Sequence, residues 1–179
     1  SDEWISTRTG IKERRISHVE VSDLAAVASQ RALAAAGLAP EDLDLIIFGT
    51  CTADSLIPSS AAILQDKLGA TRAAAFDLNA ACSGFLYGLV VGANMIRSGT
   101  NRAVLVIGAE KLSRHLDFTD RSTAVLFGDG AGAVVLEATS EPVGLLTSEL
   151  GMDGTVHDIL HTPRSGSAGR SPWRCWTGW

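Results

Sequence analysis

Three short, largely apolar runs constrain the fold of this chain more than any other feature. They cover residues 45–50, 74–78 and 103–108, and each has the length of a β-strand. A continuous apolar run, as opposed to an alternating one, is typical of a strand covered on both faces, as in a parallel sheet. Because stretches of helical periodicity separate the runs, we expect an α/β fold around a central, largely parallel sheet of buried strands.

Three stretches show the apolar spacing of amphipathic helices. The first is expected from Ser22, as N-cap, to Ala36, with Gly37 as its stop, and the second from about residue 58 to Leu68 before Gly69. The third follows Cys82 and runs to Gly99. The predicted apolar stripes are Leu24, Val27, Ala28 and Leu33 in the first helix, and Phe85, Leu86, Leu89, Val90, Ala93 and Ile96 in the third.

A glycine-rich segment at residues 127–133 contains the G-x-G-x-x-A spacing of a dinucleotide-binding fingerprint. That fingerprint must open a helix, whereas this segment leads into Val134-Val135-Leu136, which we expect to be a strand. We therefore reject a nucleotide site here and interpret the glycines as points of close backbone approach. Residues 145–150 are predicted to form a further strand.

Composition excludes several classes of function. The chain has 179 residues, 46% of them hydrophobic, and a formal charge of −5, which indicates a globular domain with no electrostatic footprint for nucleic acid. Its three cysteines are widely spaced and form neither a disulfide framework nor a paired metal motif. With no apolar run long enough for a membrane span and no leader peptide, we expect a cytoplasmic protein.

Cys82 is the candidate nucleophile. It lies between a predicted strand and the first turn of a predicted helix, in Ala80-Ala81-Cys82-Ser83-Gly84-Phe85. The unpaired N–H groups and the dipole of a helix N-terminus favour an anion, so we expect a lowered thiol pKa and an exposed, reactive sulfur on a tight elbow. Taken alone, the residue fits a small buried apolar cysteine equally well.

Both ends of the sequence differ from its middle. Trp4, Arg8 and further basic residues near the start could stack on adenine and pair with phosphates, or simply form a solvated basic loop. We assign residues 1–163 to one domain and 164–179, which contain three of the four tryptophans, to a disordered or out-of-frame tail. The absence of an initiator methionine suggests that residues precede Ser1. Joining Cys175 to His157 and His161 in a metal site is a weak alternative, and we expect no metal.

Four motifs in order resemble β-ketoacyl-acyl carrier protein synthase III, a condensing enzyme of the thiolase fold. They lie at residues 1–11, 80–85, 120–123 and 127–132. The resemblance implies a layered α/β/α/β/α fold, of which this chain would hold mostly the first half with a mixed, largely parallel sheet. It implies acyl-CoA and malonyl-acyl carrier protein as substrates, no cofactor, and a homodimer.

The resemblance also implies roles for single residues. Cys82 would carry the acyl group, and Trp4, Arg8 and Arg121 would bind coenzyme A. The residues that match the acyl pocket are Ile57, which would reach it across the dimer interface, Leu112 and Phe127.

Two departures from the family leave the function open. The histidine and asparagine that activate malonyl thioester in the family have no counterpart here, so we expect self-acylation at most from this chain. Ile57 replaces an aromatic residue common in the family, which leaves the starter length open. The alternatives are a polyketide or quinolone-type starter synthase, and a non-catalytic truncated subunit that only dimerises.

Overall fold

The structure is a computed structural model that describes residues 1–162. The chain divides into two compact units, residues 1–148 and a second that begins at Glu149. In the described part of the second unit, the one regular element is a 3₁₀ turn at Gly154–Val156. The predicted tail at 164–179 lies outside the described residues, and so does Cys175.

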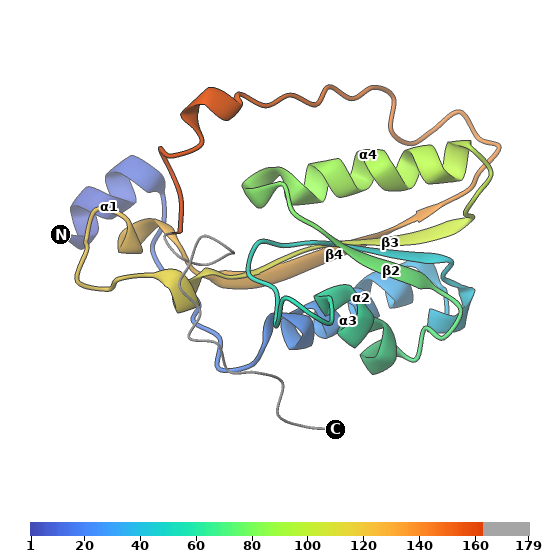
Figure 1. The fold of residues 1–179 in the computed structure, drawn as a ribbon, viewed down its shortest axis with the longest axis horizontal. Coiled ribbons are helices and arrows are strands. Elements are labelled where there is room, and N and C mark those ends of the chain that lie inside the picture. The colour runs from blue at the N-terminus through green and yellow to red at the C-terminus, as the bar shows by residue number, and fades with distance from the viewer. Residues whose placement is uncertain (163–179) are drawn as a thin grey trace. The chain divides into compact units, whose positions relative to one another are not determined.

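A four-stranded sheet forms the centre of the first unit (Figure 1). Its strands are β1 (Leu45–Gly49), β2 (Ala74–Leu78), β3 (Ala103–Lys111) and β4 (Asp129–Glu137), in the order β2-β1-β3-β4. Strand β1 runs parallel to both β2 and β3, whereas β4 is antiparallel to β3. The prediction of a mixed, largely parallel sheet is confirmed, and the glycine-rich segment opens a strand as expected.

Helices cover both faces of this sheet. Helices α2 (Val21–Ala36) and α3 (Ser60–Leu68) lie on one face and α4 (Gly84–Arg97) on the other, whereas α1 (Asp2–Thr9) stands at one end (Figure 1). Ile46 and Phe48 belong to the core beneath α2 and α3, and Leu45 and Ile47 to the core beneath α4. Alternate residues of β1 thus face opposite layers, which explains why its apolar run is continuous.

Two of the predicted strands differ from expectation. Strand β2 forms where predicted, but it stands at the edge of this sheet and is partly exposed, with Phe76 at 37%. The expectation of a buried strand was therefore wrong for β2. Residues 145–150 form no strand, and Leu146 is 88% exposed.

The start and inward face of α2 also differ from prediction. The helix begins at Val21 after Glu20, whose backbone N–H donates to the Asp23 carboxylate at 3.1 Å. Ser22 is not the N-cap but a buried residue inside the helix, and its hydroxyl donates to Asp54 at 3.0 Å. The buried residues are Val21, Ser22, Ala25, Ser29 and Leu33, so only Leu33 of the predicted stripe is correct.

Candidate active site

Helix α4 packs on the sheet through a row of glycines. Gly84, Gly88 and Gly92 are its buried residues, spaced by four so that they share one face. A Cβ atom at Gly88 would lie 2.9 Å from Val106 Cγ1, and one at Gly92 would lie 3.1 Å from Leu136 Cδ1. The helix can lie this close to the sheet because these positions carry no side chain.

The first turn of α4 rests on the carboxyl ends of two strands. A Cβ atom at Gly49, the last residue of β1, would lie 2.9 Å from the Gly84 carbonyl carbon. In β3, a Cβ atom at Gly108 would lie 3.1 Å from Phe85 Cβ. These contacts hold the start of the helix, and therefore the turn that carries Cys82, against this edge of the sheet.

Cys82 lies in the 3₁₀ turn Ala81–Ser83 that leads directly into α4. Ala81 has a φ of 47°, the one positive φ among non-glycine residues in the described chain. This left-handed conformation is unfavourable for alanine, and the turn is supported by a 3.1 Å hydrogen bond from Ala81 N–H to Asn79 Oδ1. Cys82 is exposed. The alternative of a buried apolar cysteine is therefore wrong, and a strained elbow presents the sulfur.

A second thiol lies at the same edge. Cys51 follows β1, and its backbone N–H donates to Glu110 Oε1 at 2.9 Å. The Glu110 carboxylate also accepts from the hydroxyls of Thr50, at 3.3 Å, and Thr52. Glu110 belongs to β3, so this carboxylate ties the loop after β1 to the neighbouring strand.

The environment of Cys51 keeps its thiol protonated. Burial of the sulfur and the Glu110 carboxylate raise the pKa of Cys51 to about 12, and the charge of Cys82 acts in the same direction. Although the residue as a whole is exposed, the adjacent Glu110 carboxylate opposes a negative charge on the sulfur. At neutral pH, Cys51 is therefore a thiol and a poor nucleophile.

The predicted coenzyme A residues are surface groups. Trp4 is 50% exposed on α1, and the Arg8 guanidinium carbon lies 4.4 Å from the centre of its ring. Arg121 is exposed in a turn whose Asp120 carboxylate accepts from Ser122 Oγ and Thr123 Oγ1, each at 2.6 Å. The side-chain bond from Ser122, followed by that from Thr123, lowers the pKa of Asp120.

Asp129 joins three segments around the predicted acyl pocket. Its carboxylate accepts from Ser17 N–H at 2.7 Å and from Ser113 N–H and Oγ at 2.9 and 2.7 Å, while its own N–H donates to Arg15 O at 2.8 Å. Burial opposes ionisation, but the hydrogen bonds from Ser113 and Ser17 lower the pKa of Asp129. The carboxylate thereby connects the chain after α1 to the turn at Leu112–His115 and to β4.

Two of the three residues that the sequence predicts to line an acyl pocket flank these Asp129 contacts. Leu112 precedes Ser113 and Phe127 precedes β4, and both are half-buried. Ile57 is 80% exposed in the loop between β1 and α3. The structure therefore brings Leu112 and Phe127 to segments joined by Asp129 and leaves Ile57 facing solvent.

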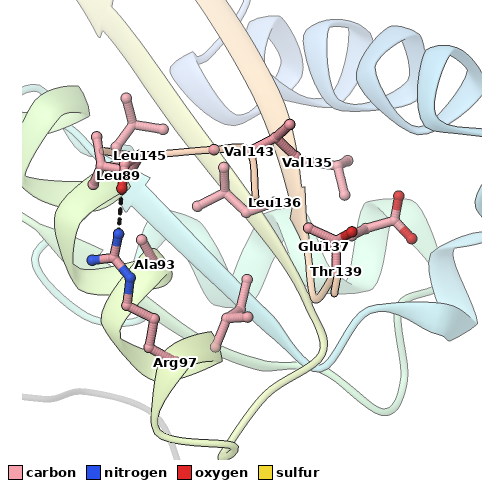
Figure 2. A pocket seen from close by; sticks show the side chains of 11 residues that line it. Leu89, Ala93, Arg97, Val135, Leu136, Glu137, Thr139, Val143 and Leu145 are labelled. Atoms are coloured by element: carbon pink, nitrogen blue, oxygen red, sulfur yellow. Dashed lines mark hydrogen bonds between the residues drawn. The ribbon is translucent and has the colours of Figure 1, made fainter. Parts of the chain in front are cut away.

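A hollow of about 650 Å³ lies elsewhere, at the other end of α4 (Figure 2). Leu89, Ala93 and Leu136 line it, and the Arg97 guanidinium donates to Leu145 O at its rim. It contains neither Cys82 nor any predicted acyl-pocket residue.

Metal and membrane interpretations find no support in residues 1–162. Within that range, no group of three or more histidine, cysteine, aspartate or glutamate side chains could hold a metal ion. The Nδ1 atoms of His157 and His161 lie 3.3 and 2.9 Å from the backbone oxygens of Gly154 and Asp158. No helix in this part of the chain is both long and apolar enough to cross a bilayer.

Sequence reasoning missed several residues of this site. Cys51 and Glu110 were not singled out, although each follows or ends a predicted strand and parallel strands meet at one edge. Asp129 was considered only as part of the rejected nucleotide motif and of the motif at residues 127–132 that resembles the family, with no role of its own. The glycine face of α4 was missed because glycine carries no apolar signal, although a spacing of four would have indicated it.

Comparisons with known proteins agree in both sequence and fold. The family profile of 3-oxoacyl-[acyl-carrier-protein (ACP)] synthase III matches residues 76–154. A β-ketoacyl-[acyl-carrier-protein] synthase III 2 of Vibrio vulnificus strain YJ016 is 58% identical over 168 residues, which are 94% of this chain and 46% of the relative. The synthase III of Caldanaerobacter subterraneus is 54% identical over 93% of this chain and 51% of its own length.

Solved structures show the same relationship. The synthase III of Pseudomonas aeruginosa PAO1 is 41% identical with a TM-score of 0.84, over 94% of this chain and 54% of that one. The priming β-ketosynthase of the R1128 polyketide pathway is also 41% identical, with a TM-score of 0.77 over 79% of this chain and 43% of its own. The chain spans about half the length of the relatives it matches. In sequence and in its thiolase-like fold, it is similar to about half of a β-ketoacyl-acyl carrier protein synthase III.

Proposed function

We propose that this chain provides the acyl-accepting thiol of an acyltransferase that condenses an acyl-CoA starter with malonyl-acyl carrier protein, the step that initiates fatty acid synthesis. The observation that carries the proposal is the exposed Cys82 on a strained turn, held against the sheet by the Gly49–Gly84 contact. The similarity to synthase III supplies the substrate class. The condensation belongs to the whole protein, whereas acylation of Cys82 needs only the residues of this site.

The acylation step uses the Cys82 sulfur as a nucleophile. The thiolate attacks the thioester carbonyl, a new carbon–sulfur bond forms, and coenzyme A leaves as its thiolate, which then takes up a proton. The Cys82 backbone N–H is the proposed donor to the oxyanion of the tetrahedral intermediate. The Cys51 thiol does not compete for the acyl group because its raised pKa keeps it protonated.

Trp4, Arg8 and Arg121 are the proposed coenzyme A residues. The half-exposed Trp4 ring presents a flat surface for adenine, and Arg8 is already stacked on it at 4.4 Å. Arg8 and Arg121 would pair with phosphate groups through their planar guanidinium forks. No metal or other cofactor takes part in this proposal.

The acyl pocket and the dimer form one proposal. Leu112 and Phe127 would line the acyl chain, and the exposed Ile57 would complete the pocket in a partner subunit rather than its own. The free edge of β2, with Phe76 37% exposed, supports a homodimer because an uncovered apolar strand edge invites pairing with a second strand. A cytoplasmic location and acyl carrier protein as a partner follow from the same proposal.

Intact-protein mass spectrometry tests the function directly. The chain is incubated with acetyl-CoA and a series of longer acyl-CoA donors, with Cys82→Ser as the control and Cys51→Ser as a matched loss of the neighbouring thiol. We expect one acyl group per chain, absent in Cys82→Ser and present in Cys51→Ser. A protein that is folded by circular dichroism but takes up no acyl group would contradict the proposal and favour a subunit that only dimerises.

The donor series also addresses the second candidate function. The chain is 41% identical to a polyketide priming β-ketosynthase and equally identical to the Pseudomonas synthase III. Preference for acetyl or short branched donors supports fatty acid initiation, whereas preference for an unusual starter supports a polyketide role.

A further inference from the structure

The two described cysteines lie at one edge of the sheet. Cys51 follows β1 and Cys82 lies in the turn after β2, and these strands are parallel neighbours, so their carboxyl ends meet. The backbones of Gly49 and Gly84 are in contact, and each glycine is two residues from one of the cysteines. The topology therefore brings two sequence-distant thiols to the same place.

Both thiols can react without disturbing the sheet. Both residues are exposed, and neither takes part in the pairing of β1 with β2. The charge of Cys82 reaches the Cys51 thiol and contributes to its raised pKa, which agrees with their proximity. Because both residues lie in turns outside the paired strands, a disulfide between them would break no strand hydrogen bond.

The two thiols differ in reactivity. Oxidants attack thiolates, and Cys51 stays protonated beside Glu110 at neutral pH. Oxidation of this pair therefore begins at Cys82. Cys51 then remains a neutral thiol beside the oxidised Cys82 sulfur.

We propose that Cys51 and Cys82 form a reversible disulfide when Cys82 is oxidised by a hydroperoxide. In the first step, the Cys82 thiolate attacks one peroxide oxygen, the O–O bond breaks, and Cys82 becomes a sulfenic acid with release of hydroxide, or alkoxide from an organic peroxide. In the second step, the Glu110 carboxylate, which accepts a hydrogen bond from the Cys51 thiol, takes the Cys51 proton as the sulfur attacks the sulfenic sulfur. The S–O bond breaks, and the departing hydroxide receives that proton and leaves as water.

This inference goes beyond the proposed acyl transfer, in which Cys51 has no part. The disulfide occupies the Cys82 sulfur and blocks acylation until a dithiol reductant restores it. It also diverts the sulfenic acid from further oxidation to sulfinic acid, which is not reversed by thiols. Cys51 would thus act as a resolving thiol that preserves the nucleophile under oxidative conditions.

The test uses hydrogen peroxide on the full chain in a Cys175→Ser background, which removes the third cysteine. We expect the intact mass to fall by two hydrogen atoms, digestion without reduction to yield a linked Cys51–Cys82 peptide, and dithiothreitol to restore alkylation of Cys82 by iodoacetamide. In Cys51→Ser and Cys51→Ala, Cys82 should instead gain two or three oxygen atoms that dithiothreitol does not remove.

Two results would overturn the proposal. One is the same gain of oxygen at Cys82 with and without Cys51, with no linked peptide. The other is a disulfide found only between separate molecules on a non-reducing gel. Because alkylation and not acylation is the readout, a chain that forms the disulfide but accepts no acyl group refutes the proposed function and leaves this inference standing.

Discussion

Replacing Gly49 by alanine tests how Cys82 is positioned. The new Cβ atom would lie 2.9 Å from the Gly84 carbonyl carbon, 3.1 Å from the Gly84 oxygen and 3.1 Å from Ile107 O. All three are backbone atoms, so no rotamer change relieves the contact, and the start of α4 must move away from β1. Because Cys82 lies two residues before Gly84, its sulfur moves with the helix.

The expected loss of stability in Gly49→Ala follows from the cost of overpacking. An extra methyl group in a closely packed interface costs about 1–3 kcal/mol. For a chain of this size, each kcal/mol lowers the melting temperature by about 2–4 °C, so we expect a decrease of about 2–12 °C. Displacement of the thiol should also slow acylation of Cys82, measured by mass spectrometry at temperatures where the variant is folded.

Gly132→Ala is the matched control. Gly132 also lies in a strand, β4, but a Cβ atom there has no neighbour within 4 Å. We expect this variant to melt at or slightly above the parent temperature, because alanine costs less entropy than glycine in a strand. Equal melting temperatures and equal acylation rates for the two variants would refute the argument that the glycine contact holds Cys82 in place.

Three further predictions concern other parts of the site. Asp77→Ala removes the carboxylate that accepts from Ser60 N–H at 2.9 Å and Ala61 N–H at 2.7 Å at the start of α3, and should lower stability by about 1 kcal/mol in urea unfolding; an unchanged midpoint would contradict this capping role. Because its pKa is lowered in the folded state, Asp129 contributes folding stability above its unfolded-state pKa of about 3.9, and this stability is lost as the pH falls through the lower folded-state pKa. Asp129→Asn should therefore reduce the loss of stability at acidic pH, and an identical loss in the variant would refute this role of Asp129. Trp4→Ala should raise the acyl-CoA concentration that gives half the maximal rate of Cys82 acylation about 5- to 150-fold, the range expected for losing one base–aromatic stack, with Trp4→Phe intermediate; an unchanged half-saturating concentration would exclude adenine stacking on Trp4.

Local signals determined the elements of the fold. Strands β1 and β3, at residues 45–49 and 103–111, were predictable from the runs at 45–50 and 103–108 because continuous runs of apolar residues fit a sheet covered on both faces. The ends of α2 and α3 were predictable because Gly37 and Gly69 adopt a φ of 71°, which side chains disfavour. The position of Cys82 before α4 followed from the same kind of signal, since the elbow is built within a few residues.

Tertiary structure decided what those local signals leave open. The inward face of α2 could not be read from the sequence because a helix rich in alanine and serine has no strong apolar stripe, and its neighbours select which residues are buried. Partial exposure of β2 depends on which strands lie beside it, not on its own residues. The roles of Glu110 and Asp129 depend on hydrogen bonds to partners 58 and 112 residues away, and only the folded chain brings these together. Sequence thus singled out Cys82 as the candidate nucleophile, whereas the close packing of Gly49 against Gly84, which only the folded chain shows, determines how its turn is held.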